Sequence, residues 1–132
     1  MGRFAHDADL LDSFEGFCLN NRIKAGVFNL VGALKSVKLG YYDQKAKKYV
    51  NCVQLEKKLE IASCSGNISL RGSRIFVHAH ITLADLKGRC WGGHLMKGSK
   101  IFAAEYFIQE LKGKEFIRVY DKATGLNLWP LK

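Results

Sequence analysis

The spacing of hydrophobic positions predicts one helix near the start of the chain. Leu10, Phe14 and Phe17 or Cys18 recur at helical spacing within Asp9–Leu19, and the first residue of that segment is placed to cap the opening turn. Two asparagines follow and end the pattern.

Beyond residue 34 the pattern is that of strands separated by polar turns. An apolar segment, 25–34, is consistent with either a buried strand or a passage from strand to loop. A glycine at 66 indicates a bulge, and the almost unbroken apolar run at 101–108 indicates a central strand covered on both faces. The later predicted strands are 37–43, 48–53, 59–70, 75–83, 91–96, 101–108 and 115–120.

The strand at 75–83 carries the most informative polar residues of the chain. Alternate side chains of a strand point to opposite faces, so one face is uniformly apolar and the other carries His78, His80 and Thr82. The apolar face must turn to the core. The two histidines are therefore expected to face solvent, a cleft or a neighbouring subunit.

Two imidazoles at this spacing can chelate one divalent ion, and His94 is the natural third ligand. It follows Gly92-Gly93, where the backbone can approach closely, and comes shortly after the strand that carries His78 and His80. Three histidines with one open position suit zinc. The alternative is that the histidines are only hydrogen-bonded or lie on the surface.

Glu105 interrupts the most apolar segment of the chain. Burying a carboxylate is costly unless it has a partner, so Glu105 could orient a metal-binding histidine, pair with a cation, or lie at a subunit interface. An exposed position at a strand edge is the other interpretation. His6 is expected on the surface.

Length and composition fit a single domain over residues 1–132, with 48% hydrophobic residues and one proline. The N-terminal residues resemble no signal peptide and no run approaches the length of a membrane span, so a cytoplasmic protein without membrane partners is expected. The four cysteines are far apart, which favours free, mostly buried thiols.

The formal net charge of +9 favours acidic partners such as DNA. The lysines are scattered over predicted turns and strand ends, however, where they also serve as solvating groups or guards against edge pairing. The charge alone leaves both interpretations open.

The sequence resembles the plant and prokaryote conserved (PPC) domain family, which occurs in AT-hook nuclear proteins of plants and as stand-alone prokaryotic proteins. The resemblance covers nearly the whole chain. The matching segments, in order, are Asp9-Leu10-Leu11, Val31-Gly32-Ala33-Leu34, Leu39-Gly40-Tyr41, Leu59-Glu60-Ile61, Ser65-Gly66-Asn67-Ile68, Val77-His78-Ala79-His80, Gly92-Gly93-His94-Leu95 and Ala104-Glu105.

The resemblance implies an α+β domain, a largely antiparallel sheet with flanking helices, assembled as a homotrimer. It also implies a metal site at His78, His80 and His94, which the plant members lack, so the chain looks like the stand-alone prokaryotic type. No AT-hook is present, and Lys57-Lys58 stands where the family commonly has Gly-Arg. Any role that the family's arginine has in a site or in a trimer contact is therefore in doubt for this chain.

Three functional hypotheses follow. The first is a trimeric metal-binding module with a DNA-binding or regulatory role. The second is a zinc-dependent enzyme acting on an unidentified small molecule, with Glu105 as the nearest acid or base; whether the protein is an enzyme stays open, because no catalytic motif accompanies the histidines. The third is a trimer whose histidines only satisfy hydrogen bonds.

Overall fold

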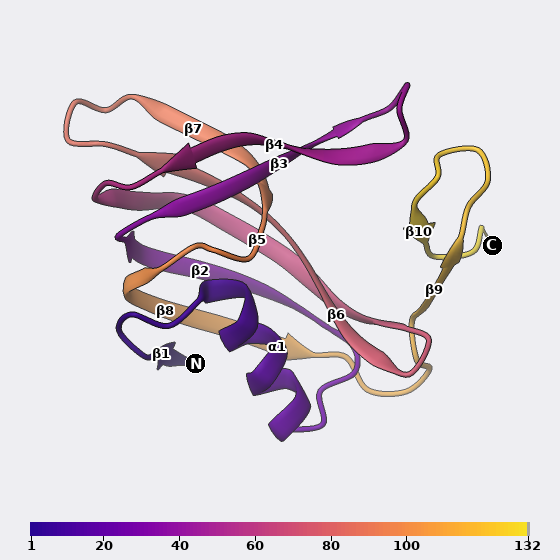
Figure 1. Ribbon diagram of the computed structural model, residues 1–132. Helices are drawn as coiled ribbons and strands as arrows, with labels where there is room; N and C mark the ends of the chain where they lie inside the picture. Colours follow the sequence, from indigo (N-terminus) through magenta and orange to yellow (C-terminus); the bar gives the residue numbers. More distant parts are fainter. Residues whose placement is uncertain (132) are drawn as a thin grey trace.

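The computed structural model describes residues 1–131, and within them it has one helix, α1 (Leu10–Asn20; Figure 1). Asp9 caps it as predicted, accepting a hydrogen bond from the backbone N–H of Asp12 at 2.9 Å. The resemblance implied flanking helices, whereas the described residues supply only this one. No helix in residues 1–131 is long and apolar enough to cross a membrane.

The strands form one connected, mostly antiparallel sheet, which confirms the predicted α+β class (Figure 1). Its main path runs β1-β8-β2-β5-β6-β7-β3-β4, and β9 pairs with β5 in parallel. Residue 132, the last of the expected domain, lies outside the described residues. The strands are β1 (Gly2–Phe4), β2 (Gly26–Leu34), β3 (Val37–Asp43), β4 (Lys48–Leu55), β5 (Leu59–Arg71), β6 (Arg74–Ala84), β7 (Cys90–Leu95), β8 (Ile101–Glu110), β9 (Ile117–Tyr120) and β10 (Asn127–Leu128).

Side chains of strand β6 alternate between the core face and the outer face of the sheet, as the sequence pattern predicts. Val77, Ala79, Ile81 and Leu83 are all buried, and α1 packs against this strand. Each large aliphatic side chain buried in this way contributes roughly 1.5–3 kcal/mol to folding. The helix therefore covers the apolar face of β6 and leaves the histidine face on the other side.

Within a single chain, strand β8 is covered on one face only, whereas its apolar sequence predicts cover on both. Ile101 and Ala104 are buried, but Phe102, Glu105 and Phe107 are exposed. One face of β8 turns to the core and the other is exposed on the surface of the chain. An apolar sequence does not by itself say what covers its second face.

Gly66 does not form the predicted bulge, since the β5–β6 register shifts between Ile61 and Ser63 instead. Gly66 has a packing role. A Cβ atom at this position would lie 2.3 Å from the carbonyl oxygen of His78 and 2.5 Å from the Phe28 ring. Glycine is required here because the core ring of Phe28 and the neighbouring strand occupy the space of a side chain.

The cysteines are free in the described residues, as predicted, but only two of them are buried. Burial raises the pKa of the Cys18 and Cys64 thiols to about 12. Cys52 and Cys90 are exposed. The buried pair is therefore protonated and chemically inert at neutral pH.

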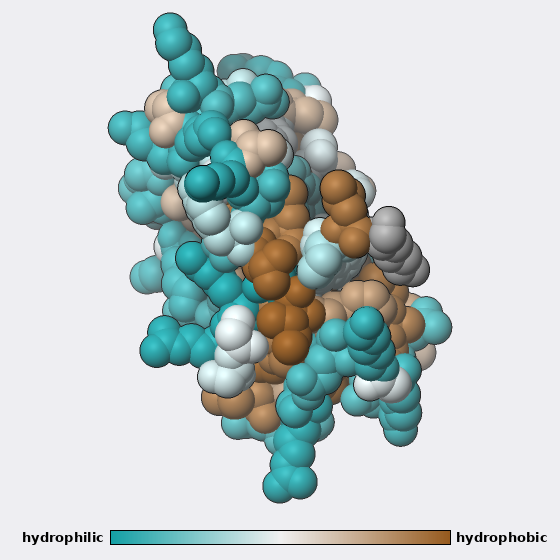
Figure 2. Space-filling model, turned by 90° about the vertical axis from the view of Figure 1, so that its right-hand side faces the viewer, coloured by the Kyte–Doolittle hydropathy of each residue, from teal (hydrophilic) through white to brown (hydrophobic). Residues whose placement is uncertain are grey.

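The C-terminal strands β9 and β10 lie beside the far end of the β5–β6 hairpin (Figure 1). Figure 2 faces this side of the molecule and shows a strip of hydrophobic residues between hydrophilic ones. Leu126 and Leu128 are half-buried, whereas Leu131 is fully exposed. The end of the chain thus packs against the rest of the molecule through residues 126–128 and not through its last described residues.

Candidate metal centre

Two neighbouring strands bring the three predicted histidines together. His78 and His80 lie on β6, and His94 lies on β7 in register with His80. The ring centroids are 5.1 Å (His78 to His94), 5.2 Å (His78 to His80) and 5.5 Å (His80 to His94) apart. One nitrogen from each ring lies within 4.8 Å of the others.

Two nitrogens of this histidine cluster are buried without a partner. Among residues 1–131, nothing forms a hydrogen bond with Nε2 of His78 or Nδ1 of His94. Buried polar atoms are normally paired, so two orphaned nitrogens in one cluster call for an explanation. The ligand nitrogens of the three histidines lie within 4.8 Å of one another, against a spacing of roughly 3.3 Å between the nitrogen ligands of tetrahedral zinc. The residues therefore fit a bound metal ion.

The surroundings of the cluster keep the imidazoles of His78 and His94 neutral. Burial lowers the pKa of both His78 and His94 to about 4, assisted at His78 by the charge of Arg118 and then His80, and at His94 by His78 and His80. A neutral imidazole offers the lone pair that a metal ion needs. At neutral pH both imidazoles are therefore uncharged and able to bind a metal ion.

Close backbone packing and one aromatic ring position His94. A Cβ atom at Gly93 would lie 3.0 Å from the carbonyl oxygen of Gly40, the residue of β3 that pairs with His94. Tyr49 of β4 stacks on the imidazole of His94, with centroids 4.5 Å apart and planes at 28°. Gly93 thus allows the close backbone approach predicted from the sequence. This approach places β3 and β4 beside the cluster.

The structure does not bring Glu105 to the histidines. It lies exposed on β8, opposite Arg3 of β1 and Val31 of β2, and strands β2 and β5 separate β8 from β6. His6 is also distant from the cluster on the surface, with its Nδ1 2.7 Å from the carbonyl oxygen of Phe102. Of the predicted site residues, only the three histidines converge.

Sequence reasoning missed the residues that surround the cluster, above all Tyr49 and Arg118. Arg118 is only 7% exposed, although its strand, Ile117–Tyr120, is otherwise composed of apolar and aromatic residues. That context was the available signal, because alternation along a strand points Arg118 to the face opposite Ile117 and Val119. Its position near His78 depends on the pairing of β9 with β5.

Comparisons with known proteins agree with this architecture. Residues 1–112 match the family model of the Plants and Prokaryotes Conserved (PCC) domain. A solved metal-containing protein of Archaeoglobus fulgidus is similar over 98% of this chain and 90% of its own, with 39% identity and a TM-score of 0.91. A plant- and prokaryote-conserved (PPC) protein of Pyrococcus horikoshii is similar over 98% of this chain and 89% of its own, with 37% identity and a TM-score of 0.92.

Two further similarities concern other roles. A Bacteroides thetaiotaomicron protein to which DNA binding has been attributed is similar over 97% of this chain and 88% of its own, with 25% identity and a TM-score of 0.88. The bifunctional protein GlmU of a Synechococcus strain is 36% identical over 119 residues, or 89% of this chain. That stretch is only 18% of the relative's length, so the chain corresponds to a small part of it.

Proposed function

The chain belongs to the Plants and Prokaryotes Conserved domain family, and from this premise we propose that it is a zinc-binding module with a DNA-associated, regulatory role. His78, His80 and His94 would hold the ion. Three histidine ligands leave one position of tetrahedral zinc for water or for an atom of a bound ligand.

One observation carries the metal proposal: the two orphaned nitrogens of His78 and His94 point to a missing partner. Hydrogen bonds among the described residues reach neither nitrogen, so the alternative that these histidines are only hydrogen-bonded to the rest of the chain does not account for them. A metal ion shared with His80 would satisfy both at once. The metal-containing relative from Archaeoglobus fulgidus supports the same assignment.

Self-association as a homotrimer is the second part of the proposal. Large hydrophobic side chains are exposed on the outer face of β2 and β8, with Val31 at 59%, Phe102 at 58% and Phe107 at 49%. Several large apolar side chains exposed on one sheet face favour an interaction site there. A subunit covering it would also place Glu105 at an interface, one of the roles suggested by its sequence context.

DNA binding is the third part. The net charge of +9 attracts polyanions, and the DNA-binding role attributed to the Bacteroides relative supports this partner. Phosphate contacts by scattered lysines would give binding with little sequence selectivity that weakens steeply with salt. Fluorescence anisotropy of a DNA duplex at low and moderate salt tests this part, and an affinity that does not change with salt would contradict it.

A zinc-dependent enzyme is the second candidate, favoured by the exposure of His80 and by a cavity that opens beside His78 and His94. Zinc at such a site polarises a carbonyl or activates water. The carboxylate proposed for acid or base work, Glu105, is remote on β8. The cavity is lined by basic and aromatic groups, which suits binding more directly than proton transfer, so we rank the binding module first.

Metal analysis of protein purified without a histidine tag tests the central claim. We expect about one zinc per chain in the wild type, loss of zinc in His78→Ala, and retention in the control His6→Ala, whose histidine lies away from the cluster. Wild-type protein that neither retains zinc nor takes it up on addition would contradict the proposal. Equal zinc content in wild type and His78→Ala would do the same.

A further inference from the structure

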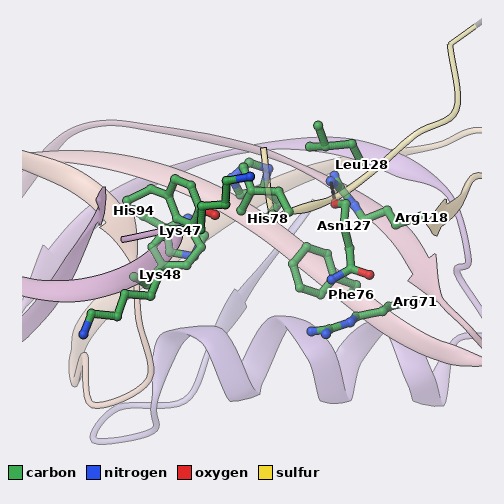
Figure 3. A pocket seen from close by; sticks show the side chains of 13 residues that line it. Lys47, Lys48, Arg71, Phe76, His78, His94, Arg118, Asn127 and Leu128 are labelled. Atoms are coloured by element: carbon green, nitrogen blue, oxygen red, sulfur yellow. Dashed lines mark hydrogen bonds between the residues drawn. The ribbon is translucent and has the colours of Figure 1, made fainter. Parts of the chain in front are cut away.

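A cavity of about 350 Å³ adjoins the histidine cluster. His78 and His94 form one wall, and the C-terminal segment forms the opposite one (Figure 3). Its volume is at the lower end of the range of small-molecule sites. The cavity therefore has room for a small metabolite next to the histidines.

Arg118 is a buried cation in the wall of this cavity. Its Nε donates a hydrogen bond to Oγ of Ser69 (2.8 Å), Nη1 donates to the carbonyl oxygen of Asn127 (3.1 Å), and Nη2 donates to Oδ1 of Asn67 (2.8 Å). The rings of Phe76 and Trp129 each lie 5.0 Å from the guanidinium carbon. These contacts fix the guanidinium group and leave N–H donors to spare, because an arginine has five.

No contact of Arg118 neutralises its charge. Its hydrogen-bond partners are a hydroxyl and two amide oxygens, and within residues 1–131 no Asp or Glu forms an ion pair with it. A buried charge without a counter-charge is costly. Fixed, buried and unneutralised, the guanidinium has the properties of an anion-binding group.

The other charged residues that line the cavity are positive as well. Its lining includes Lys47, Lys48 and Arg71 beside Arg118, and none of the described residues that line it is acidic. In Figure 3, Lys47 and Arg118 lie on opposite sides of His78. Positive groups thus surround the approach to the histidines.

The C-terminal segment that supplies Arg118 is held in place by its own contacts. It lies beyond residues 1–112, the part matched by the family model. Strand β9 pairs with the end of β5, Tyr42 donates a hydrogen bond to the carbonyl oxygen of Thr124 (2.7 Å), and Lys47 donates to that of Lys122 (2.9 Å). These contacts join the segment to the β3–β4 hairpin and close the cavity on that side.

We propose that this cavity binds a small anionic metabolite, with a phosphate or carboxylate group held by Arg118 and a further donor atom directed to the open position of the histidine-bound metal. The inference rests on the proposed zinc site and adds a ligand class to it. A small molecule fits better than a DNA backbone, because Arg118 is only 7% exposed and duplex phosphates cannot follow it into the wall of a cavity.

Calorimetric titration of zinc-loaded protein with inorganic phosphate, and separately with succinate, tests the proposal at constant ionic strength. We expect saturable binding of at least one anion by the wild type. Arg118→Gln should weaken it about tenfold or more, Arg118→Lys should retain part of it, and Arg22→Gln, an exposed arginine at the end of α1, should leave it unchanged. The preferred anion distinguishes a phosphate ligand from a carboxylate ligand.

Measuring zinc and folding in every sample separates this inference from the metal proposal. If wild-type protein binds no zinc, the proposed function fails. If zinc is bound but neither anion binds, or Arg118→Gln binds it as tightly as the wild type, the inference alone is wrong. If Arg118→Gln does not fold, Arg71→Gln replaces it, because Arg71 lines the cavity at an exposed position. We then expect Arg71→Gln to bind the anion more weakly than the wild type. Unchanged binding would overturn the proposal.

A DNA control addresses the remaining alternative. We expect Arg118→Gln to bind a short DNA duplex as the wild type does. If the duplex, and neither small anion, lost affinity in this variant, Arg118 would contact nucleic acid and the cavity would not be a metabolite site.

Discussion

His80 on β6 lies directly opposite His94 on β7, and their ring centroids are 5.5 Å apart. Cross-strand neighbours are held by the backbone ladder, so this pair is positioned before any ion arrives. His78, two residues earlier on β6, completes a triangle whose corners come from only two strands. Such preorganisation lowers the entropic cost of binding a metal.

Zinc should stabilise the fold against heat. An ion that binds only the folded state at a free concentration of a hundred times its Kd contributes about 2.7 kcal/mol, or roughly 10 °C in Tm for a domain of this size. Differential scanning calorimetry with and without zinc measures the shift. It should disappear in His80→Ala and persist in Thr82→Ala, which alters the next position on the same face of β6. An equal shift in both variants would place the ion elsewhere.

Asp85, in the turn after β6, should make the stability of the fold decrease as the pH falls into the acid range. Burial acts to raise the pKa of this carboxyl, but hydrogen bonds from Arg89, Lys57 and the backbone of Lys87 hold it well below its usual value. A carboxyl whose pKa is lower in the folded state stabilises the fold above the unfolded pKa of about 4 and loses that contribution as the pH falls below it.

Asp85→Asn should therefore be less stable than the wild type at neutral pH, and the difference should shrink as the pH falls from about 4 toward 2. Urea unfolding across this pH range measures it. A difference that stays constant with pH would show that the carboxylate charge of Asp85 contributes nothing.

Gly66→Ala should destabilise the protein by about 1–3 kcal/mol, the usual range for overpacking. The added methyl group would overlap the carbonyl oxygen of His78 and the Phe28 ring. Gly16→Ala is the matched control, because nothing lies within 4 Å of a Cβ at that helical position and alanine favours helix. Chemical denaturation should give opposite signs for the two variants, and a neutral Gly66→Ala would refute the packing role.

The exposed face of β2 and β8 should mediate self-association. Introducing a charge at the centre of an apolar interface leaves it buried and unpaired, so Val31→Lys should convert trimers into monomers. Size-exclusion chromatography with light scattering measures the mass. Leu19→Lys, which changes an exposed leucine on α1, is the control and should remain trimeric. A trimeric Val31→Lys variant, or a monomeric wild type, would contradict this assignment.

The sequence by itself determined much of the local structure and singled out the three histidines. Helical spacing and Asp9 predicted α1, and alternation in β6 assigned His78 and His80 to the face opposite the core. These features depend only on neighbours a few residues apart along the chain, where side-chain direction follows from backbone geometry.

Only the tertiary structure decided which distant residues meet. Strand order separates Glu105 from the histidines, and the parallel pairing of β9 with β5 brings Arg118 beside His78. Likewise, the exposed outer face of β8 and the tight space at Gly66 follow from what packs against each strand. Pairing between strands far apart in sequence depends on the whole core, and no local pattern encodes it.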